Sequence, residues 1–125
     1  MDLVIKYGKI VTPSGTYSGG IAIDKGKIVA IASEEFLPVA DKTIDAGGKY
    51  ILPGVIDEHT HIGFKTTLSA TAITETKAAA QGGVTTVGIF ITRPGETAST
   101  IFESLRQEFE TSAITDCFFH SNVVD

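Results

Sequence analysis

The sequence predicts an α/β fold in which a small amino-terminal β-sheet precedes alternating strands and helices. Residues 1–50 consist of short runs rich in β-branched residues, separated by glycine-containing turns. From residue 51 to 125 the pattern changes to strand, helix, strand, helix, strand, an order that calls for parallel strands joined by right-handed crossovers. We therefore expect two domains, an amino-terminal β-sheet segment (1–50) and a β/α segment (51–125).

The first segment carries turn signals between its apolar runs. Pro13-Ser14-Gly15 predicts a turn. Asp24-Lys25-Gly26 lies between two apolar runs and predicts a hairpin in which Gly26 takes a positive φ. We expect strands over 3–7, 9–12, 21–23, 27–31 and 43–45, the last leading to a turn at Gly47-Gly48.

The second segment begins with apolar residues interrupted by Pro53-Gly54. A helix is expected over 69–81, and Gly82-Gly83 predicts its end in a left-handed cap. Residues 84–92 are almost all apolar or β-branched, which is typical of a strand buried on both faces of a parallel sheet. Arg93-Pro94-Gly95 ends that strand, and residues 116–124 predict a third one.

A second helix is expected over 98–110. Ile101, Leu105 and Phe109 are spaced four residues apart, so they share one helix face and form the predicted core contact. Thr100 with Glu103 fits a capping box at the start of this helix.

The composition excludes several function classes. The formal charge is −5 with no basic cluster, which disfavours a nucleic acid or an anionic membrane as partner. Cys117 is the single cysteine, so no internal disulfide can form, and a reduced, cytoplasmic setting fits best. We expect no secretory signal, because the first residues lack a basic region followed by a long apolar stretch, and no apolar run approaches the ~20 residues that span a bilayer.

Two histidines, His59 and His61, follow an apolar run at the end of the first strand of the second segment. Side chains at i and i+2 of a strand point to the same side, so both imidazoles aim at one point and can hold a metal ion. The carboxyl end of such a strand is where α/β barrels carry their active sites. We therefore take His59 and His61 as metal ligands. No residue of this chain is assigned as catalytic, and none as cofactor-binding.

Other polar residues near the pair leave alternatives open. Asp57 could orient a ligand histidine or could bind backbone at the strand end, and both interpretations have equal weight. Glu58 points the other way and is structural. His120 could face the barrel mouth, although a packed or solvent-facing histidine fits better, and Cys117 is expected to be a buried thiol without a histidine partner.

The segment Pro53-Gly54-Val55-Ile56-Asp57-x-His59-x-His61 resembles the signature of the amidohydrolase superfamily. The similarity is greater to its cyclic amidohydrolases, namely dihydroorotase, allantoinase and dihydropyrimidinase (hydantoinase). Residues 5–11, 26–31, 44–54 and 76–86 resemble the same family in the same order, so the likeness covers almost the whole chain.

The resemblance implies a fold and a reaction. Residues 1–50 would be part of a β-sandwich, and residues 51–125 the first β/α units of a TIM-type (β/α)8 barrel that is incomplete in this chain. In such enzymes one or two divalent metals, usually Zn²⁺, lie at the barrel mouth, and the pair matching His59 and His61 binds the more buried one. A metal-bound hydroxide then hydrolyses the C–N bond of a small cyclic amide or imide.

The same resemblance implies that the chain is the amino-terminal portion of a longer enzyme. A (β/α)8 barrel needs about 250 residues, and a bridging carboxylated lysine, two histidines and an aspartate would follow residue 125. The fragment alone would be inactive, and the full-length protein would form homo-oligomers. Two alternatives remain: a non-catalytic scaffold or assembly relative, and a small metal-binding or subunit protein.

The residues after the motif depart from the family pattern. Dihydroorotases and allantoinases place an arginine two positions past the second histidine, and hydantoinases place an aspartate there. This chain has Ile62-Gly63-Phe64-Lys65 instead. No substrate is assigned from this segment, and neither Phe64 nor Lys65 is taken as a binding residue.

Overall fold

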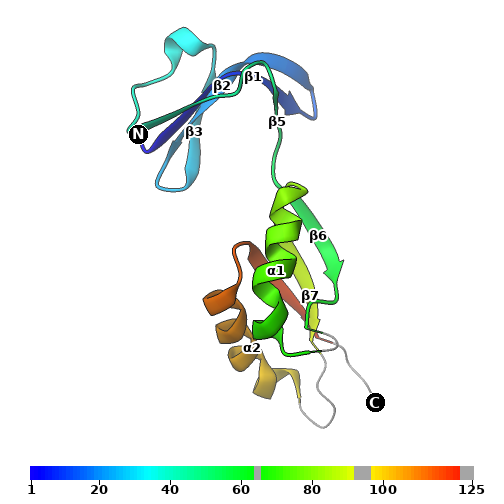
Figure 1. Ribbon diagram of the computed structural model, residues 1–125. Helices are drawn as coiled ribbons and strands as arrows, with labels where there is room; N and C mark the ends of the chain where they lie inside the picture. The colour runs from blue at the N-terminus through cyan, green and yellow to red at the C-terminus, as the bar shows by residue number, and fades with distance from the viewer. Residues whose placement is uncertain (64–65, 92–96, 122–125) are drawn as a thin grey trace. The chain divides into compact units, whose positions relative to one another are not determined.

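The computed structural model describes residues 1–63, 66–91 and 97–121 (Figure 1). Contacts divide the chain into two compact units, Met1–Pro53 and Gly54–Asp125, and each is described by itself. No helix in the described part of the chain has both the length and the apolarity needed to cross a membrane.

The first unit is built on one mixed sheet. Its strands are β1 (Leu3–Thr12), β2 (Gly15–Asp24), β3 (Lys27–Ala32), β4 (Lys42–Asp45) and β5 (Tyr50–Ile51). The order is β3-β2-β1-β4, with β5 also paired to β1. The first three strands are antiparallel neighbours, whereas β4 and β5 run parallel to β1. The strand β1 therefore pairs with three other strands, β2, β4 and β5.

The hairpin between β2 and β3 has the predicted turn. Lys25 and Gly26 have φ angles of 50° and 73°, the pair of positive values that a type I′ turn requires. The Lys25 backbone N–H donates to the Asp2 carboxylate at 2.7 Å, which ties this turn to the start of the chain. The expected break at Gly8 is wrong: β1 continues through it, with a register irregularity between Ile5 and Gly8.

A small core lies against this sheet. Val4 and Ala22 are fully buried and Leu37 is 9% exposed. Leu37 follows a 3-10 helix, η1 (Glu34–Phe36), that the sequence pattern did not predict. This short helix brings the chain from β3 back over the sheet, so Leu37 can cover the two strand residues.

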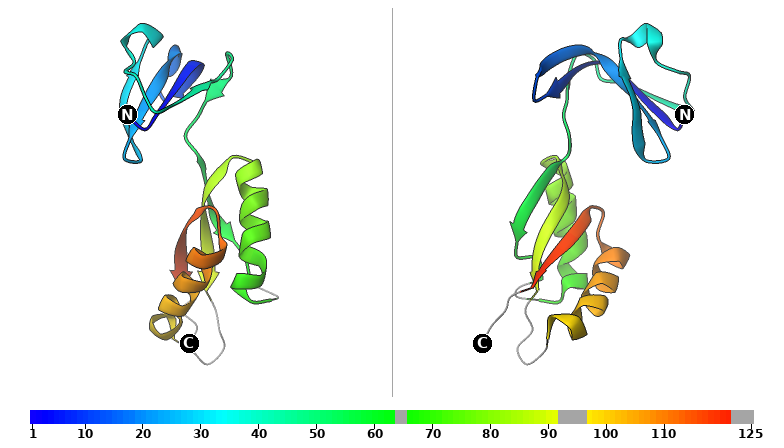
Figure 2. Two further views of the ribbon diagram at one scale, coloured as in Figure 1. Left: turned by 60° about the vertical axis from the view of Figure 1, so that its left-hand side comes forward. Right: turned by 180° about the vertical axis from the view of Figure 1, so that it is seen from behind.

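The second unit has the predicted strand–helix order. Its elements are β6 (Val55–Thr60), α1 (Leu68–Gln81), β7 (Val84–Ile91), α2 (Ala98–Ser112) and β8 (Asp116–Ser121). The three strands are parallel in the order β6-β7-β8. Figure 2 shows both helices on one side of this sheet. The first β/α crossovers of the expected pattern are therefore present.

The helices cover one face of the three-stranded sheet. Ile101, Leu105 and Phe109 are 2%, 7% and 2% exposed, which confirms the predicted core face of α2. They pack with Val87 and Ile89, alternate residues of β7. Residues 86, 88 and 90 of β7 therefore face the other side of the sheet.

The predicted end of α1 is correct, whereas the predicted cap at the start of α2 is not. Gly83 has a φ of 88° directly after the C-cap Gly82, so α1 ends in the predicted left-handed conformation. α2 begins at residue 98 as predicted, but the predicted capping box of Thr100 and Glu103 is wrong because Thr97 is the N-cap. The Thr100 hydroxyl instead donates to the Thr97 carbonyl at 2.8 Å.

Candidate metal centre

The two histidines of the motif meet at the carboxyl end of β6. Their Nε2 atoms are 3.2 Å apart, and both side chains are exposed. The predicted convergence of the two imidazoles is therefore present. The carboxyl ends of parallel strands are the edge at which open α/β sheets bind ligands.

The spacing of these nitrogens fits one shared metal ion. Zinc–nitrogen bonds of 2.0–2.1 Å at tetrahedral angles put two ligand nitrogens about 3.4 Å apart. The observed 3.2 Å is close to that value, and it is also short enough for an N–H···N hydrogen bond. Among residues 1–63, 66–91 and 97–121, no group of three or more His, Cys, Asp or Glu side chains could hold a metal. The pair is thus a partial donor set.

A β-bulge sets the position of His59. The β6–β7 ladder pairs Asp57 with Val87 and next pairs Thr60 with Ile89, so three steps on β6 match two on β7. The extra residue falls at Glu58–His59. Bulges bend a strand and re-aim its side chains, and they are frequent beside active sites.

The Asp57 carboxylate binds backbone rather than an imidazole. Its Oδ1 accepts a hydrogen bond from the His59 backbone N–H at 3.2 Å. Of the two interpretations left open for Asp57, this contact is thus the one with the backbone. The bond satisfies an N–H that the bulge removes from the regular ladder.

The third histidine comes from β8 and reaches across the sheet. His120 Nε2 lies 3.0 Å from the Glu58 carbonyl oxygen on β6. Its ring stacks on Phe90 at 4.6 Å between centroids. His120 is partly buried, so the packed interpretation describes it better than the solvent-facing one.

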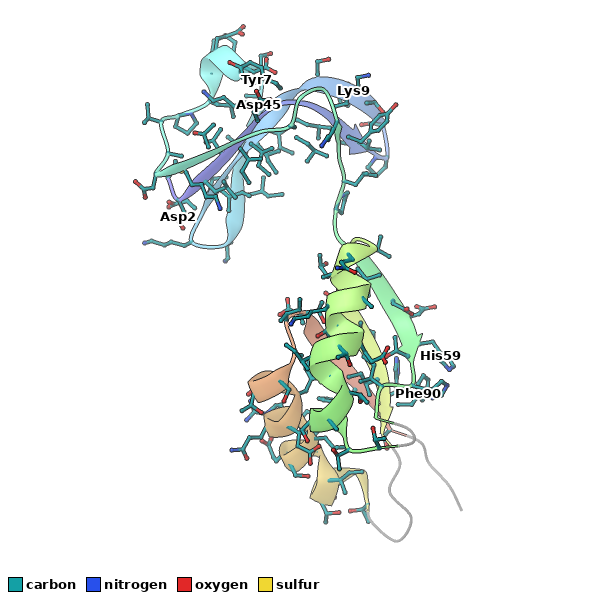
Figure 3. All side chains as sticks on the ribbon, in the orientation of Figure 1. Asp2, Tyr7, Lys9, Asp45, His59 and Phe90 are labelled. Atoms are coloured by element: carbon teal, nitrogen blue, oxygen red, sulfur yellow. The ribbon has the colours of Figure 1, made fainter. Side chains whose placement is uncertain are left out.

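Phe90, at the carboxyl end of β7, contacts all three histidines. Its ring centroid lies 4.4 Å from that of His59 and 5.9 Å from that of His61. Figure 3 shows His59 and Phe90 next to each other at the ends of their strands. The aromatic ring thus forms an apolar support beside the imidazole pair.

Sequence reasoning missed Phe90, Gly88 and Thr60. Thr60 Oγ1 donates to the Gly88 carbonyl at 2.8 Å, a bond between β6 and β7 beside the bulge. A signal for Gly88 was available, since glycine inside an apolar strand often marks a close approach of another backbone. The order of the strands allowed a place for His120 near the motif, but nothing in the sequence shows that Phe90 lies between His120 and the pair, because those contacts join residues far apart in the chain.

A pocket of about 610 Å³ opens beside the motif, between β6, β7 and α1. His61, Asp57 and Thr60 line it from the strand side and Thr71 and Glu75 from α1, with six further lining residues. The pocket reaches one member of the pair, which leaves His61 accessible from the helix side.

Cys117 is less buried than the sequence predicts. It is partly buried and packs against the core of the second unit. Burial, followed by the negative charges of Glu110 and Asp116, raises the pKa of its thiol to about 11. The thiol is therefore protonated at neutral pH and is a poor nucleophile.

Some sequence predictions lie outside the described residues. These are the unassigned Phe64 and Lys65 after the motif, the strand end at Arg93-Pro94-Gly95, and the continuation of β8 through residues 122–124.

Comparisons with known proteins found relatives but no matching family model. The sequence is 46% identical to a D-hydantoinase of Ralstonia pickettii over 90 residues, 70% of this chain and 19% of that protein. It is 47% identical to an allantoinase of Desulfitobacterium hafniense over 60 residues, 48% of this chain and 13% of that protein.

Solved structures resemble the chain over its full length. The crystal structure of a dihydropyrimidinase from Brevibacillus agri matches with a TM-score of 0.84 and 37% identity, covering 100% of this chain and 28% of that one. The chain thus spans between 13% and 28% of the length of these three relatives.

Proposed function

We infer that this chain, whose sequence and fold match the amino-terminal portion of the cyclic amidohydrolases, supplies two metal ligands of such an enzyme. The observation that carries this proposal is the 3.2 Å separation of His59 Nε2 and His61 Nε2 at the carboxyl end of β6. The complete protein would hydrolyse the C–N bond of a small cyclic amide or imide.

The proposed metal is Zn²⁺, for which imidazole nitrogens are common ligands. When bound, a divalent metal lowers the pKa of water and polarises a carbonyl group. The chain's own contribution is to hold two imidazoles at a fixed spacing. Zinc sites normally take at least three protein ligands, so further ligands would come from outside these residues.

The relatives suggest the substrate class. Their names denote hydantoins, dihydropyrimidines and allantoin as substrates of those proteins. We propose a cyclic amide or imide of this kind for the complete protein. The matching structures also support the proposal that β6, α1, β7, α2 and β8 begin a (β/α)8 barrel, with residues 1–50 contributing to a β-sandwich. A homo-oligomer remains part of the same proposal.

The proposal is tested by removing both histidines from the complete protein. The double variant His59→Ala/His61→Ala should lose most of its bound metal by elemental analysis and should lose hydrolysis of a hydantoin, a dihydropyrimidine and allantoin. Gln107→Ala, at an exposed position of α2, is the matched surface control and should keep both properties. Unchanged metal content and activity in the double variant would remove the basis of the proposal.

The alternative function is a non-catalytic scaffold or assembly relative. The intact pair at ligand spacing favours the enzyme. Metal analysis of the wild-type complete protein separates the two, because a scaffold needs no bound metal, whereas the enzyme should contain at least one ion per chain.

A further inference from the structure

The bulge at Glu58–His59 leaves backbone groups that side chains satisfy. The Asp57 carboxylate takes the His59 N–H, and Thr60 Oγ1 binds the Gly88 carbonyl of the neighbouring strand. The Glu58 carbonyl is bound by His120 Nε2 at 3.0 Å. Of these three bonds, only the one made by His120 involves a residue of β8.

The direction of this bond follows from its chemistry. A carbonyl oxygen can only accept, so His120 Nε2 must carry the hydrogen. His120 pairs in register with Phe90 on β7, yet its ring nitrogen reaches β6, two strands away. The bond therefore ties one edge of the three-stranded sheet to the other.

Gly88 makes this reach possible. It lies in β7, directly below the Glu58 carbonyl, and a Cβ there would be 2.5 Å from that oxygen and 2.7 Å from Phe118 Cζ. The carbonyl can approach β8 across the middle strand because position 88 has no side chain.

His120 also acts on the histidine pair through Phe90. The His120 and Phe90 rings stack with an interplanar angle of 21°. The same Phe90 ring contacts His59 and His61. The His120 ring thus supports the pair by two routes, one through the backbone before His59 and one through the aromatic ring.

We propose that His120 is a positioning residue for the histidine pair: its bond to the Glu58 carbonyl and its stacking on Phe90 hold the bulge that orients the His59 imidazole. His120 is not a metal ligand in this arrangement, because Phe90 lies between its ring and the pair. The inference rests on the proposed function for its use in metal binding, but the geometry itself is independent of metal.

The test uses two variants that separate the roles of the His120 ring. His120→Phe keeps an aromatic ring on Phe90 and removes the donor, whereas His120→Gln keeps an N–H near the position of Nε2. Asp116→Asn, at an exposed position on the same strand, is the control. Binding of Co²⁺ to the complete protein is followed by its visible absorption spectrum.

We expect His120→Phe to bind Co²⁺ about 10- to 100-fold more weakly and with an altered spectrum, as found when groups that orient ligand histidines are removed. His120→Gln should recover most of that affinity, and Asp116→Asn should match wild type. Wild-type affinity and an unchanged spectrum in His120→Phe would overturn the proposal.

A metal-free measurement separates this inference from the proposed function. In ¹⁵N-histidine NMR spectra without metal, His120 should be the Nε2–H tautomer, and His120→Phe should shift the His59 ring signals more than Asp116→Asn does. If the wild type bound no Co²⁺, the proposed function would fail, and these spectra alone would decide the inference. A Nδ1–H tautomer of His120, or unshifted His59 signals, would overturn it even if His120→Phe failed to fold.

Discussion

Gly88 is a position where the size of one side chain decides the local structure. A methyl group there would meet the Glu58 carbonyl oxygen at 2.5 Å. We expect Gly88→Ala to lower the free energy of unfolding by about 1–3 kcal/mol, because β6 or β8 must move to relieve the overlap. Chemical denaturation of the complete protein measures this.

The matched control is Gly82→Ala. Gly82 has a φ of −81°, and its added Cβ would meet nothing nearer than the Ala79 carbonyl oxygen at 3.3 Å. Its effect should stay within about 1 kcal/mol. Equal effects of the two substitutions would contradict the close approach of β6 to Gly88.

Cys117 gives a prediction that depends on pH. Because burial and two carboxylates raise its thiol pKa to about 11, the thiolate fraction rises tenfold per pH unit up to that value. Alkylation by iodoacetamide should therefore be slow at pH 8 and accelerate steadily toward pH 11. In urea the same thiol should react much faster at pH 8, and equal rates in the folded and unfolded protein would show that the fold does not protect it.

The residues around the motif show how far sequence reasoning reaches at this scale. Alternation along a strand was enough to predict that His59 and His61 converge. The bulge at Glu58–His59 could not be predicted, since it depends on how β6 aligns with β7. The support from His120 depends on β8, some sixty residues away, and on the missing side chain at Gly88.

At the scale of elements, Thr76 links α1 to the segment that enters β8. It is fully buried, its Oγ1 donates to the Ala72 carbonyl, and it accepts the Ile114 backbone N–H at 3.1 Å. Thr76→Val keeps the shape but leaves that N–H without its acceptor. We expect a loss of about 1–3 kcal/mol in the free energy of unfolding.

The control for this substitution is Thr76→Ser, which keeps the hydroxyl and should retain the bond to Ile114. Amide hydrogen exchange at Ile114 gives a second measurement, because its protection should fall in Thr76→Val and persist in Thr76→Ser. Similar exchange in both variants would contradict the bond.

Helix boundaries depend on which residues compete for the cap. The Gly82-Gly83 pair predicted the end of α1 in a left-handed cap, and the structure confirms it. The start of α2 contains several hydroxyl residues, and Thr97 bonds with the hydroxyls of both Ser99 and Thr100. Choosing among neighbouring caps needs the tertiary position of the helix, so the predicted capping residue was wrong although the predicted start at residue 98 was correct.

At the scale of the whole molecule, both units expose large apolar side chains. Phe36, Val39 and Leu52 in the first unit are 75%, 94% and 63% exposed, and Ile56 in the second is 63% exposed. Surfaces of this kind promote association in water. We expect the 125-residue chain alone to self-associate and to unfold with poor cooperativity.

Sedimentation velocity over a range of concentrations and thermal unfolding followed by circular dichroism test this expectation. The complete protein serves as the comparison and should sediment as one defined species. A monomer with a single sharp transition from the 125-residue chain alone would contradict it.

The order of elements was the most predictable property of the whole chain. Hydrophobic period and glycine positions predicted the two helices and the three parallel strands of the second unit. In the first unit they predicted β1 as two strands, which is wrong. The pairing of β4 and β5 with β1 was not predicted, because local patterns carry no information on which distant strands meet.

That pairing has a consequence for how the chain folds during synthesis. The first strand, β1, pairs with β4 from Leu3↔Lys42 onward and with β5 at Ile10↔Ile51. One edge of β1 therefore has no partner until residues about 40 positions later have been synthesised. At about 5–20 residues per second on the ribosome, that edge stays unpaired for some 2–8 s. An unpaired strand edge is a template for wrong pairing. The speed of translation through residues 12–51 thus sets how long this strand edge stays open to wrong pairing, just before the histidine motif is made.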